Sequence, residues 1–329
     1  MHLSIRALLS VIVCLLGVIA TNPAVSADAA QYPTRPIRMV IPWSAGGSTD
    51  VLGRVLADDM GRALGVPIVV ENNAGATGTI GFAQVARAVG DGYTLLLGTN
   101  STFAIAPHFY SKLPYNLETD FVAVGMIGSN PQILCVLPGM AAKTLAEFVR
   151  YAKQKPGELA YASSGVGGSS HLAMELLMSI TGINMLHVPY RGGAPALTAL
   201  LGGEAQVGFV DISTAGPLIR GGKLRALGTS GTTRVPSLPD TPTLAEAGVP
   251  GFESVTSFGL FMPARTPAGI VARVNTVLNS VLRDPQVIEK LGALGFELTG
   301  GAPDTYKAYA IGETKKWGTL IKQRHIVLP

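Results

Sequence analysis

The chain has 329 residues, of which 47% are hydrophobic and 14% are charged, and its formal net charge is +4. This composition excludes intrinsic disorder for most of the chain, and the small, dispersed positive charge does not predict a nucleic-acid surface. Two cysteines are too few for a disulfide scaffold or a four-cysteine metal site. The length is typical of two domains.

The first 27 residues predict a cleaved export signal. Residues 1–6 are short and basic, and residues 7–20 (ALLSVIVCLLGVIA) form an apolar run that suits a signal-peptide core better than a membrane span. Residues 25–27 (VSA) are small, so cleavage is expected after Ala27; an uncleaved anchor is the alternative. No later stretch is apolar for long enough to span a bilayer. The mature protein is therefore expected in the periplasm and not embedded in the membrane.

Strand-like and helix-like runs alternate along the mature chain. Residues 37–43 (IRMVIPW) read as a strand, and residues 48–64 read as a helix with an apolar face. Further strands are expected at residues 68–71, 93–98, 159–163, 185–190, 206–211 and 224–228, and extended segments at 121–137, interrupted by Gly128 and Pro131, and at 254–262. Further helices are expected at residues 78–89, 144–155, 169–180, 194–201, 214–220, 267–283 and 303–322, with a short one inside the proline-rich passage 235–250. This order predicts parallel strand pairing and an α/β fold.

Two lobes are expected from the distribution of these elements. The C-terminal part of the chain contains helices but little strand, so it cannot form a sheet of its own and is expected to return to the first lobe. The predicted lobes are residues 28–126 together with 251–329, and residues 127–250.

Three loops rich in glycine and hydroxyl groups follow predicted strands and open into helices. They are residues 43–50 (WSAGGSTD), 163–171 (SSGVGGSSH) and 190–196 (YRGGAPA), and polar residues also end strands at 99–101 and 211–214. Ligands of open α/β sheets bind beyond the carboxyl ends of the strands, and the first N–H groups of a helix bind anions. An ordinary strand–helix turn is the alternative reading of the first loop.

Catalytic and metal-binding patterns are missing from the sequence. It contains no GxSxG, no dinucleotide fingerprint and no GxxxxGK[ST]. Cys135 lies in an apolar run, and His108, His171, His187 and His325 lack metal-ligand spacing. No metal, cofactor or catalytic residue is therefore expected. His187 is expected to be a partly buried strand residue, whereas His171, beside a glycine loop, is a candidate ligand contact.

The energy of binding argues for several loops acting together. One helix N-terminus contributes at most about 2 kcal/mol, whereas micromolar affinity requires about 8 kcal/mol. A carboxylate ligand would need several loops at once and the exclusion of water. The hypothesis is a cleft between the lobes that closes on a small di- or tricarboxylate.

Long motifs resemble a known family. YPTRPIRMVIPWSAGGSTDVLGR, VVENNAGATGTIG, SSGVGGSSHLAMELL, HVPYRGGAPALTALLGGEAQVGF, LRALGTSG and PTLAEAGVPGFE are similar to the Bug-type periplasmic receptors of tripartite tricarboxylate transporters. The resemblance runs from about Tyr32 to the C-terminus. It implies a type II periplasmic binding fold with two lobes, each a mixed or parallel sheet flanked by helices, that close on a ligand in the cleft between them.

The resemblance also implies which residues hold a carboxylate, largely through backbone N–H groups and waters. In the first lobe they are Ala45, Gly46, Gly47, Ser48, Thr49, Thr99 and Asn100. In the second lobe they are Ser164, Gly165, Ser169, His171, Tyr190, Gly192, Gly193 and Asp211. Asp50 matches the motif but is expected to be structural. Trp43 and the SSGVGGSS loop are candidate specificity positions.

The function implied is that of an extracytoplasmic receptor and not an enzyme. It would capture a small carboxylated metabolite and deliver it to inner-membrane permease subunits, as a monomer with neither a cofactor nor a nucleic-acid partner. One alternative is a ligand-sensing co-receptor for a histidine-kinase ectodomain, and another is a periplasmic hydrolase. The sequence does not name the ligand.

Overall fold

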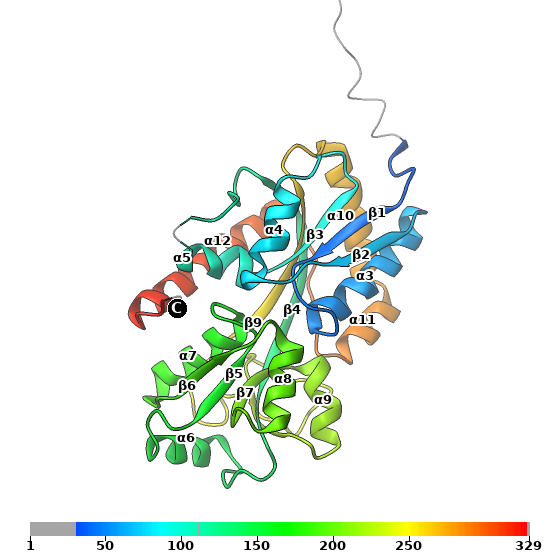
Figure 1. Cartoon of the computed structure of the whole chain (residues 1–329). Helices are drawn as coiled ribbons and strands as arrows, with labels where there is room; N and C mark the ends of the chain where they lie inside the picture. Colours follow the sequence, from blue (N-terminus) through cyan, green and yellow to red (C-terminus); the bar gives the residue numbers. More distant parts are fainter. Residues whose placement is uncertain (1–30, 111, 328–329) are drawn as a thin grey trace, which may run out of the picture.

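The computed structural model of the chain describes residues 31–110 and 112–327, so the predicted signal peptide lies outside the described residues. Two lobes stand one above the other, and the strands β4 and β9 run between them (Figure 1). Their shared strand is β4 (Phe121–Val136). The first lobe contains β1 (Ile37–Ile41), α3 (Ser48–Leu64), β2 (Ile68–Asn72), η1 (Ala76–Gly78), α4 (Thr79–Ala86), β3 (Thr94–Thr99), η2 (Ser101–Ile105), α5 (Ala106–Phe109), β9 (Val255–Pro263), α10 (Ala268–Leu282), α11 (Pro285–Gly292), β10 (Glu297–Leu298) and α12 (Pro303–Gln323). The second lobe contains α6 (Leu145–Lys153), β5 (Ala160–Ser163), α7 (Ser169–Thr181), β6 (Leu186–Pro189), α8 (Gly193–Gly202), β7 (Val207–Asp211), α9 (Ile212–Arg220) and β8 (Arg225–Thr229).

The strands form one continuous path in the order β2-β1-β3-β9-β4-β7-β5-β6, with β8 and β10 also paired to β4. Strand β1 is parallel to β2 and β3, and β5 is parallel to β6 and β7. The expected parallel pairing is confirmed inside these two groups. It is wrong for β9, which is antiparallel to both β3 and β4, and for β4, which is antiparallel to β7. The chain returns from the second lobe as β9, so this strand enters the first sheet in the opposite direction.

Strand β4 runs from one sheet to the other as one strand, and the interruptions predicted at Gly128 and Pro131 appear in its pairing, as a register shift between Met126 and Gly128 and a change of partner after Pro131. Its residues 121–131 pair with β9, and its residues 132–136 pair with β7 and β8. Pro131 lies where the pairing changes partners, a position at which its missing N–H is tolerated. At Gly128 a Cβ would lie within 2.1 Å of the carbonyl oxygen of Glu297 in β10, so glycine permits the close approach of that strand. The change of partner makes Gln132 the first β4 residue of the second sheet.

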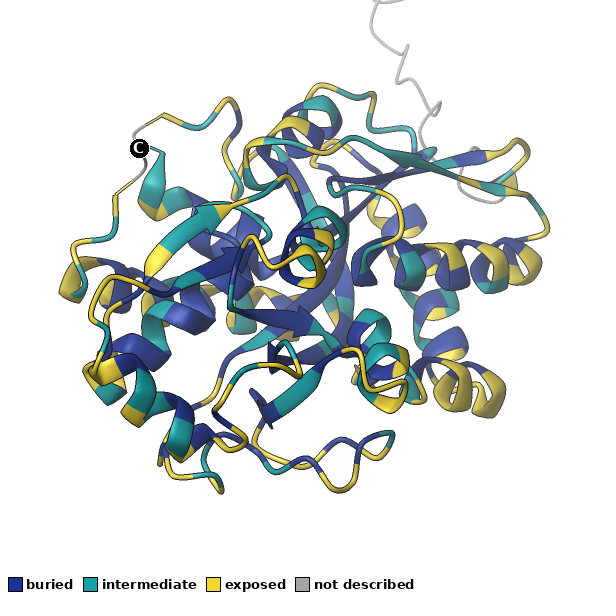
Figure 2. Ribbon diagram, turned by 60° about the horizontal axis from the view of Figure 1, so that its bottom comes forward, coloured by how far each residue is buried: buried dark blue, intermediate teal, exposed yellow. Residues whose placement is uncertain are grey.

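Each lobe buries two apolar layers, one on each face of its sheet, and Figure 2 shows the strands largely buried while the outer helix faces are exposed. In the first lobe, residues of α3, α10 and α11 form one layer, and residues of α4, η2 and α12 form the other. In the second lobe, α6 and α7 cover one face, whereas α8 and α9 cover the other. The predicted apolar face of α3 is confirmed at Leu52, Val55, Leu56 and Met60, which are buried.

Some expected elements differ in the structure. The short helix expected within residues 235–250 is absent from the described chain there, which forms turns instead. Thr243 and Glu246 do exchange the two hydrogen bonds of a helix-starting capping box, but Gly248 at φ +110° ends the segment after one turn. The helix expected to reach Val89 ends at Ala86. Helix α11 was not predicted, although Asp284 caps it by accepting a hydrogen bond from the Gln286 N–H.

Candidate ligand-binding site

A cavity lies between the lobes at the carboxyl ends of β1, β3, β5 and β7. It encloses about 50 Å³, and its lining comes from both lobes. Of the residues predicted from the sequence as ligand contacts, those on the lining are Gly47, Ser48, Thr49, Thr99, Ser164, Ser169, Gly193 and Asp211. Trp43, the candidate specificity position, also lies on the lining. The structure thus brings together residues from five separate segments of the chain. Their convergence follows from the parallel strands in each lobe, which end at the same edge of their sheet.

Three helices begin at this cavity with glycine as the N-cap residue. Gly47 precedes α3, Gly168 precedes α7 and Gly192 precedes α8, and none of these helices has a side-chain cap. A serine or aspartate N-cap would occupy N–H groups of the first turn. A glycine cap supplies no such side chain, although the Ser169 N–H at the start of α7 donates to Ser101 Oγ of the other lobe. Each helix start favours an anion by about 0.3–2 kcal/mol.

The first-lobe loop is held in shape by Asp50. Its Oδ2 accepts hydrogen bonds from the Gly46 N–H and from Arg54 Nε, both at 3.0 Å, and its Oδ1 accepts one from Asn72 at 2.9 Å. Burial alone raises the pKa of this carboxyl, but the hydrogen bonds from Arg54, Gly46 and Asn72 outweigh burial and lower the pKa. Asp50 has contacts that fit the structural role predicted for it. Gly46 adopts φ +84°, which only glycine adopts readily.

The second-lobe loop is held by a neutral imidazole. His171 is 3% exposed, and its Nδ1 accepts a hydrogen bond of 3.0 Å from the Gly167 N–H. The His187 ring stacks on it with the centroids 4.0 Å apart, and the Nε2 of His187 lies 2.6 Å from Ser163 Oγ. Burial, with His187 as a second cause, lowers the pKa of His171 to about 3, and burial lowers the pKa of His187 to about 4. Both rings are therefore neutral at pH 7.

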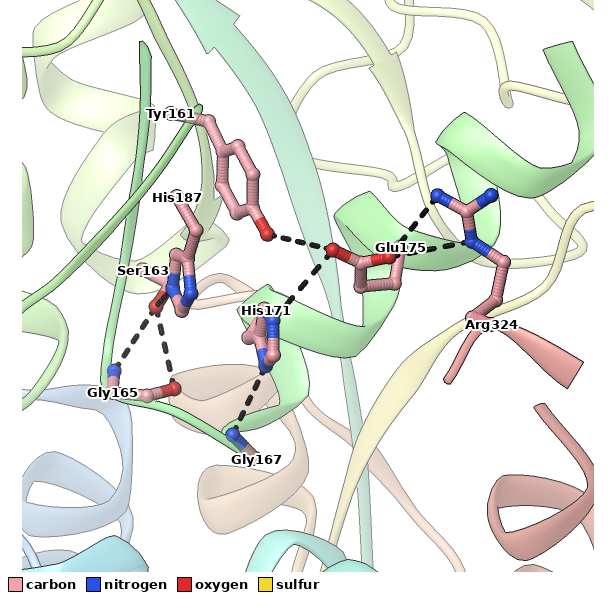
Figure 3. A network of polar contacts seen from close by, with 8 residues as sticks. All are labelled: Tyr161, Ser163, Gly165, Gly167, His171, Glu175, His187 and Arg324. Carbon is pink, nitrogen blue, oxygen red and sulfur yellow. Dashed lines mark hydrogen bonds and ion pairs between the residues drawn. The ribbon is translucent and has the colours of Figure 1, made fainter. Parts of the chain in front are cut away.

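Behind His171 lies Glu175, which joins the lobes (Figure 3). It accepts a hydrogen bond of 3.1 Å from the Tyr161 hydroxyl, and it pairs at 3.3 Å with Arg324, which follows α12. The His171 Nε2 lies 3.7 Å from the same carboxylate. That distance is too long for a hydrogen bond, and a neutral ring forms no ion pair. His171 thus lies behind the loop and not on the cavity lining.

The remaining predicted residues also lie outside the lining. Asn100 is buried and donates to the Val255 carbonyl and to Glu313, and the Tyr190 hydroxyl donates to Glu204 at an exposed position. Ala45, Gly46, Gly165 and Gly192 are likewise absent from the lining. Gly192 still matters to the shape, because a Cβ there would lie 2.4 Å from Ser44 Oγ of the other lobe.

Two polar lining residues, Gln132 and Thr256, lie outside every segment that the sequence predicted for the site. The polar lining residues that lie inside the predicted segments but were not singled out are Ser44, Ser101, Ser170 and Thr214. Gln132 and Thr256 lie on the two strands that connect the lobes, and nothing local in the sequence places those strands beside the glycine loops. A single glutamine in the otherwise apolar run PQILCV was the available signal.

The lobes touch each other across the cavity. Ser48 Oγ donates to Asp211 Oδ2 at 2.7 Å, Thr77 Oγ1 donates to the Val166 carbonyl at 2.6 Å, and the Ser169 N–H donates to Ser101 Oγ at 2.9 Å. These direct contacts define a closed arrangement. Among the described residues, Asp211 is the one charged side chain on the lining.

Within residues 31–110 and 112–327, no cluster of three or more His, Cys, Asp or Glu side chains could hold a metal ion. Cys135 is fully buried, and burial raises the pKa of its thiol. In that same part of the chain, no helix is both long and apolar enough to cross a membrane.

A two-lobed α/β fold, joined by two long strands and closed over helix N-termini, defines a periplasmic solute-binding protein. The family described as "Tripartite tricarboxylate transporter family receptor" matches residues 52–326. The chain belongs to this family, as its motifs predicted.

Individual relatives are similar in sequence to this chain over almost its whole length. BugT of Bordetella pertussis (strain Tohama I) is 35% identical over 317 residues, which cover 96% of this chain and 97% of BugT. The structure of R. palustris Rpa4515 with adipate is 34% identical with a TM-score of 0.87, and the match covers 90% of this chain and 99% of that one. MatC from Rhodopseudomonas palustris with bound malate is 33% identical with a TM-score of 0.82, over 88% and 100% of the two chains. The protein is a solute-binding receptor of the Bug type and not an enzyme.

Proposed function

We propose that this receptor captures a small carboxylated metabolite between its lobes in the periplasm and delivers it to the inner-membrane permease subunits of a tripartite tricarboxylate transporter. The observation that carries the proposal is the convergence of three glycine-capped helix starts on one cavity. Two solved relatives hold adipate and malate, which are both carboxylates. The lining residues predicted from the sequence would hold the carboxylate through their backbone N–H and hydroxyl groups.

Entry of the ligand requires the lobes to separate. The cavity of about 50 Å³ is small for a dicarboxylate, and the direct contacts of Ser48, Thr77 and Ser101 with the second lobe hold the two lobes together. Strand β4 pairs with strands of both sheets, and β9 is the strand by which the chain returns from the second lobe to the first. Bending of these two strands would open the cleft, and renewed contact would exclude water around the bound anion.

The proposal includes the maturation of the chain. The mature receptor would begin at Asp28, after removal of residues 1–27, and would act as a monomer. Residues 28–126 and 251–329 would move as one lobe, and residues 127–250 would move as the other. The mass of the protein recovered from the periplasm tests the cleavage site directly.

A thermal-shift screen of the processed protein against di- and tricarboxylates, amino acids and neutral analogues tests the ligand class. A ligand at a hundredfold excess over its Kd stabilises the folded form by about 2.7 kcal/mol, which is a clear rise in melting temperature. The proposal predicts such a rise with at least one carboxylate. A rise with neutral compounds only would overturn it.

Gly47→Val is the variant that tests the site. Gly47 has φ −82°, and a Cβ there would meet nothing closer than 3.7 Å, so the fold accepts a side chain. Valine would nevertheless block the approach of an anion to the α3 N-terminus, and the ligand-induced shift should disappear. The matched control is Gly139→Val, because a Cβ at Gly139 would meet no atom within 4 Å. Equal shifts in the two variants would remove the first-lobe loop from the site.

A further inference from the structure

Gln132 is a buried polar side chain on the cavity lining, and it belongs to none of the helix starts that are proposed to bind a carboxylate. It lies on β4 directly after the strand changes partners, it is 3% exposed, and it lines the cavity. Its backbone is fixed on both sides, because its N–H donates to Ser230 Oγ and its carbonyl accepts from the Ser230 N–H, each at 2.8 Å. These two hydrogen bonds fix the backbone of Gln132 and therefore limit where its side chain can lie.

The orientation of the Gln132 amide follows from its neighbour. Its Nε2 donates to Asp211 Oδ1 at 3.2 Å. A carboxylate oxygen only accepts hydrogen bonds, so the NH₂ group must face Asp211 and the amide oxygen must face away from it. That oxygen, Oε1, is buried and has no hydrogen-bond partner among the residues that the structure describes. A buried acceptor without a donor is costly, and native structures rarely leave one so.

The same end of the cavity carries a second acceptor. Asp211 accepts one hydrogen bond at each oxygen, from Gln132 and from Ser48, and a carboxylate has capacity for more. No lysine or arginine lies on the lining to neutralise it. Two residues before Gln132 on β4, and thus on the same face of the strand, Asn130 also buries both of its amide atoms without a partner.

The cavity lining therefore combines two kinds of polar group. The helix starts supply N–H donors that suit a carboxylate. Gln132 and Asp211 supply acceptors that suit a donor, and Asp211 lies beside the helix starts, where it accepts from Ser48 of α3. We propose that Gln132 is a specificity-determining residue and that the ligand is a carboxylate which presents an ammonium or hydroxyl group to its Oε1. This inference rests on the proposed function and narrows its substrate class.

Acids that carry neither an ammonium nor a hydroxyl group should bind less tightly than acids that carry one. The unsubstituted acids would place only C–H groups against Gln132 Oε1 and Asp211, which would leave the buried acceptors unsatisfied. A site built to hydrogen-bond a ligand group discriminates strongly against the analogue that lacks the group. The expected loss is roughly 10- to 100-fold in affinity. Because Asp211 is anionic, an amino acid should bind more tightly than the matching hydroxy acid.

The test is isothermal titration of the processed receptor with matched acids. The probes are aspartate, malate and succinate; glutamate, 2-hydroxyglutarate and glutarate; and alanine, lactate and propionate. Within each set that binds, the amino and hydroxy acids should bind at least tenfold more tightly than the unsubstituted acid. Equal or tighter binding of an unsubstituted acid would overturn the inference and leave the carboxylate receptor intact. Binding of none of the nine acids would overturn the inference together with the proposed function for these acids.

The variant Gln132→Met tests whether Gln132 determines the preference for amino and hydroxy acids over unsubstituted acids. Methionine keeps the length of the side chain and removes the amide, so the ratio between the affinities of an amino acid and its unsubstituted analogue should fall at least fivefold. A merely structural role would weaken both acids equally. Gln84→Met is the matched control, since Gln84 contacts Glu71 and Asn73 away from the cavity. An unchanged ratio in a folded Gln132→Met receptor would overturn the assignment, and the wild-type series tests the ligand class even if this variant fails to fold.

Discussion

The two glycine loops at the cavity present similar helix starts, but different chemistry holds each of them. In the first lobe, the anionic Asp50 accepts the Gly46 N–H and is itself held by Arg54 and Asn72. In the second lobe, a neutral His171 accepts the Gly167 N–H within a stack of aromatic rings. Both side chains bind N–H groups that precede the helices, so neither acts as a side-chain cap of α3 or α7.

The comparison shows that chemically different side chains, a carboxylate and an imidazole, can hold similar glycine loops. Asp50 stays ionised at physiological pH, because its pKa is lowered from an already acidic value. A neutral imidazole support depends on not being protonated. The first loop should therefore resist acid, and the second should not.

The largest expected effect is a loss of stability in mild acid. In the unfolded chain the histidines take up protons below pH 6.5, whereas in the folded protein the pKa of His171 is about 3 and that of His187 about 4. The unfolded state thus binds more protons as the pH falls from 6.5, and the free energy of unfolding decreases. The limit for His171 is about 1.4 kcal/mol per pH unit, or about 2–3 kcal/mol between pH 6.5 and 4.5; partly exposed His187 adds less.

Urea unfolding at pH 6.5, 5.5 and 4.5 measures this slope. The groups that face His171 are His187, Tyr161, Glu175 and, through Glu175, Arg324. A His171→Gln/His187→Gln double variant should lose most of the slope, and His108→Gln, outside the stack, should keep it. Parallel slopes for the wild type and the double variant would show that the acid sensitivity has another origin.

Asp50→Ala should have the next largest effect and a different pH response. It leaves the Gly46 N–H without its acceptor and removes one of the two acceptors of the Asn72 amide, which keeps the Trp43 carbonyl. This change should cost about 2 kcal/mol of stability and weaken ligand binding. Between pH 4.5 and 6.5 the cost should hardly change, since Asp50 stays ionised there. Asp58→Ala is the control on the same helix: its pair with Arg62 is exposed on both sides and should contribute less than about 0.5 kcal/mol. Equal unfolding energies for the two variants would contradict this account of the loop.

Ser48→Ala should have the smallest effect, on closure and not on folding. It removes the hydrogen bond of 2.7 Å between the two loop regions, from Ser48 to Asp211. Ligand affinity should fall by about fivefold, the equivalent of about 1 kcal/mol, while the unfolding free energy changes little. Calorimetric titration measures the affinity, and Thr276→Ala, whose hydroxyl bonds only within α10, serves as the control. A Ser48→Ala receptor of full affinity would show that closure does not depend on this contact.

Much of the fold could be predicted because its signals are local. The apolar face of α3 and the alternation of strands and helices follow from periodicity over a few turns. The loops 43–50 and 163–171 were recognisable because their glycines and hydroxyls lie between a strand and a helix. The burial of Cys135 and the partial burial of His187 also followed from their apolar neighbours, and the structure confirms both.

The roles of single residues were harder to predict where they depend on distant partners. His171 of α7 is a predicted ligand contact because it adjoins a glycine loop, whereas in the structure its ring accepts from the Gly167 N–H and stacks on His187 of β6. Gln132 drew no attention, because its place at the cavity depends on β4 leaving β9 for β7 at Pro131. Helix α11 had a readable start at Asp284 and Pro285, and was overlooked.

The sequence by itself determined the α/β class, the family and the glycine loops that open the helices, because each of these depends on residues close together in the chain. Only the tertiary structure decided which loops meet at the cavity, that His171 holds the Gly167 N–H, and that Gln132 lies on the cavity lining. Those outcomes depend on the antiparallel return of β9 and on the partner change along β4, which bring together residues far apart in sequence. Local patterns do not carry that information, because contacts of long range are settled by the packing of the whole chain.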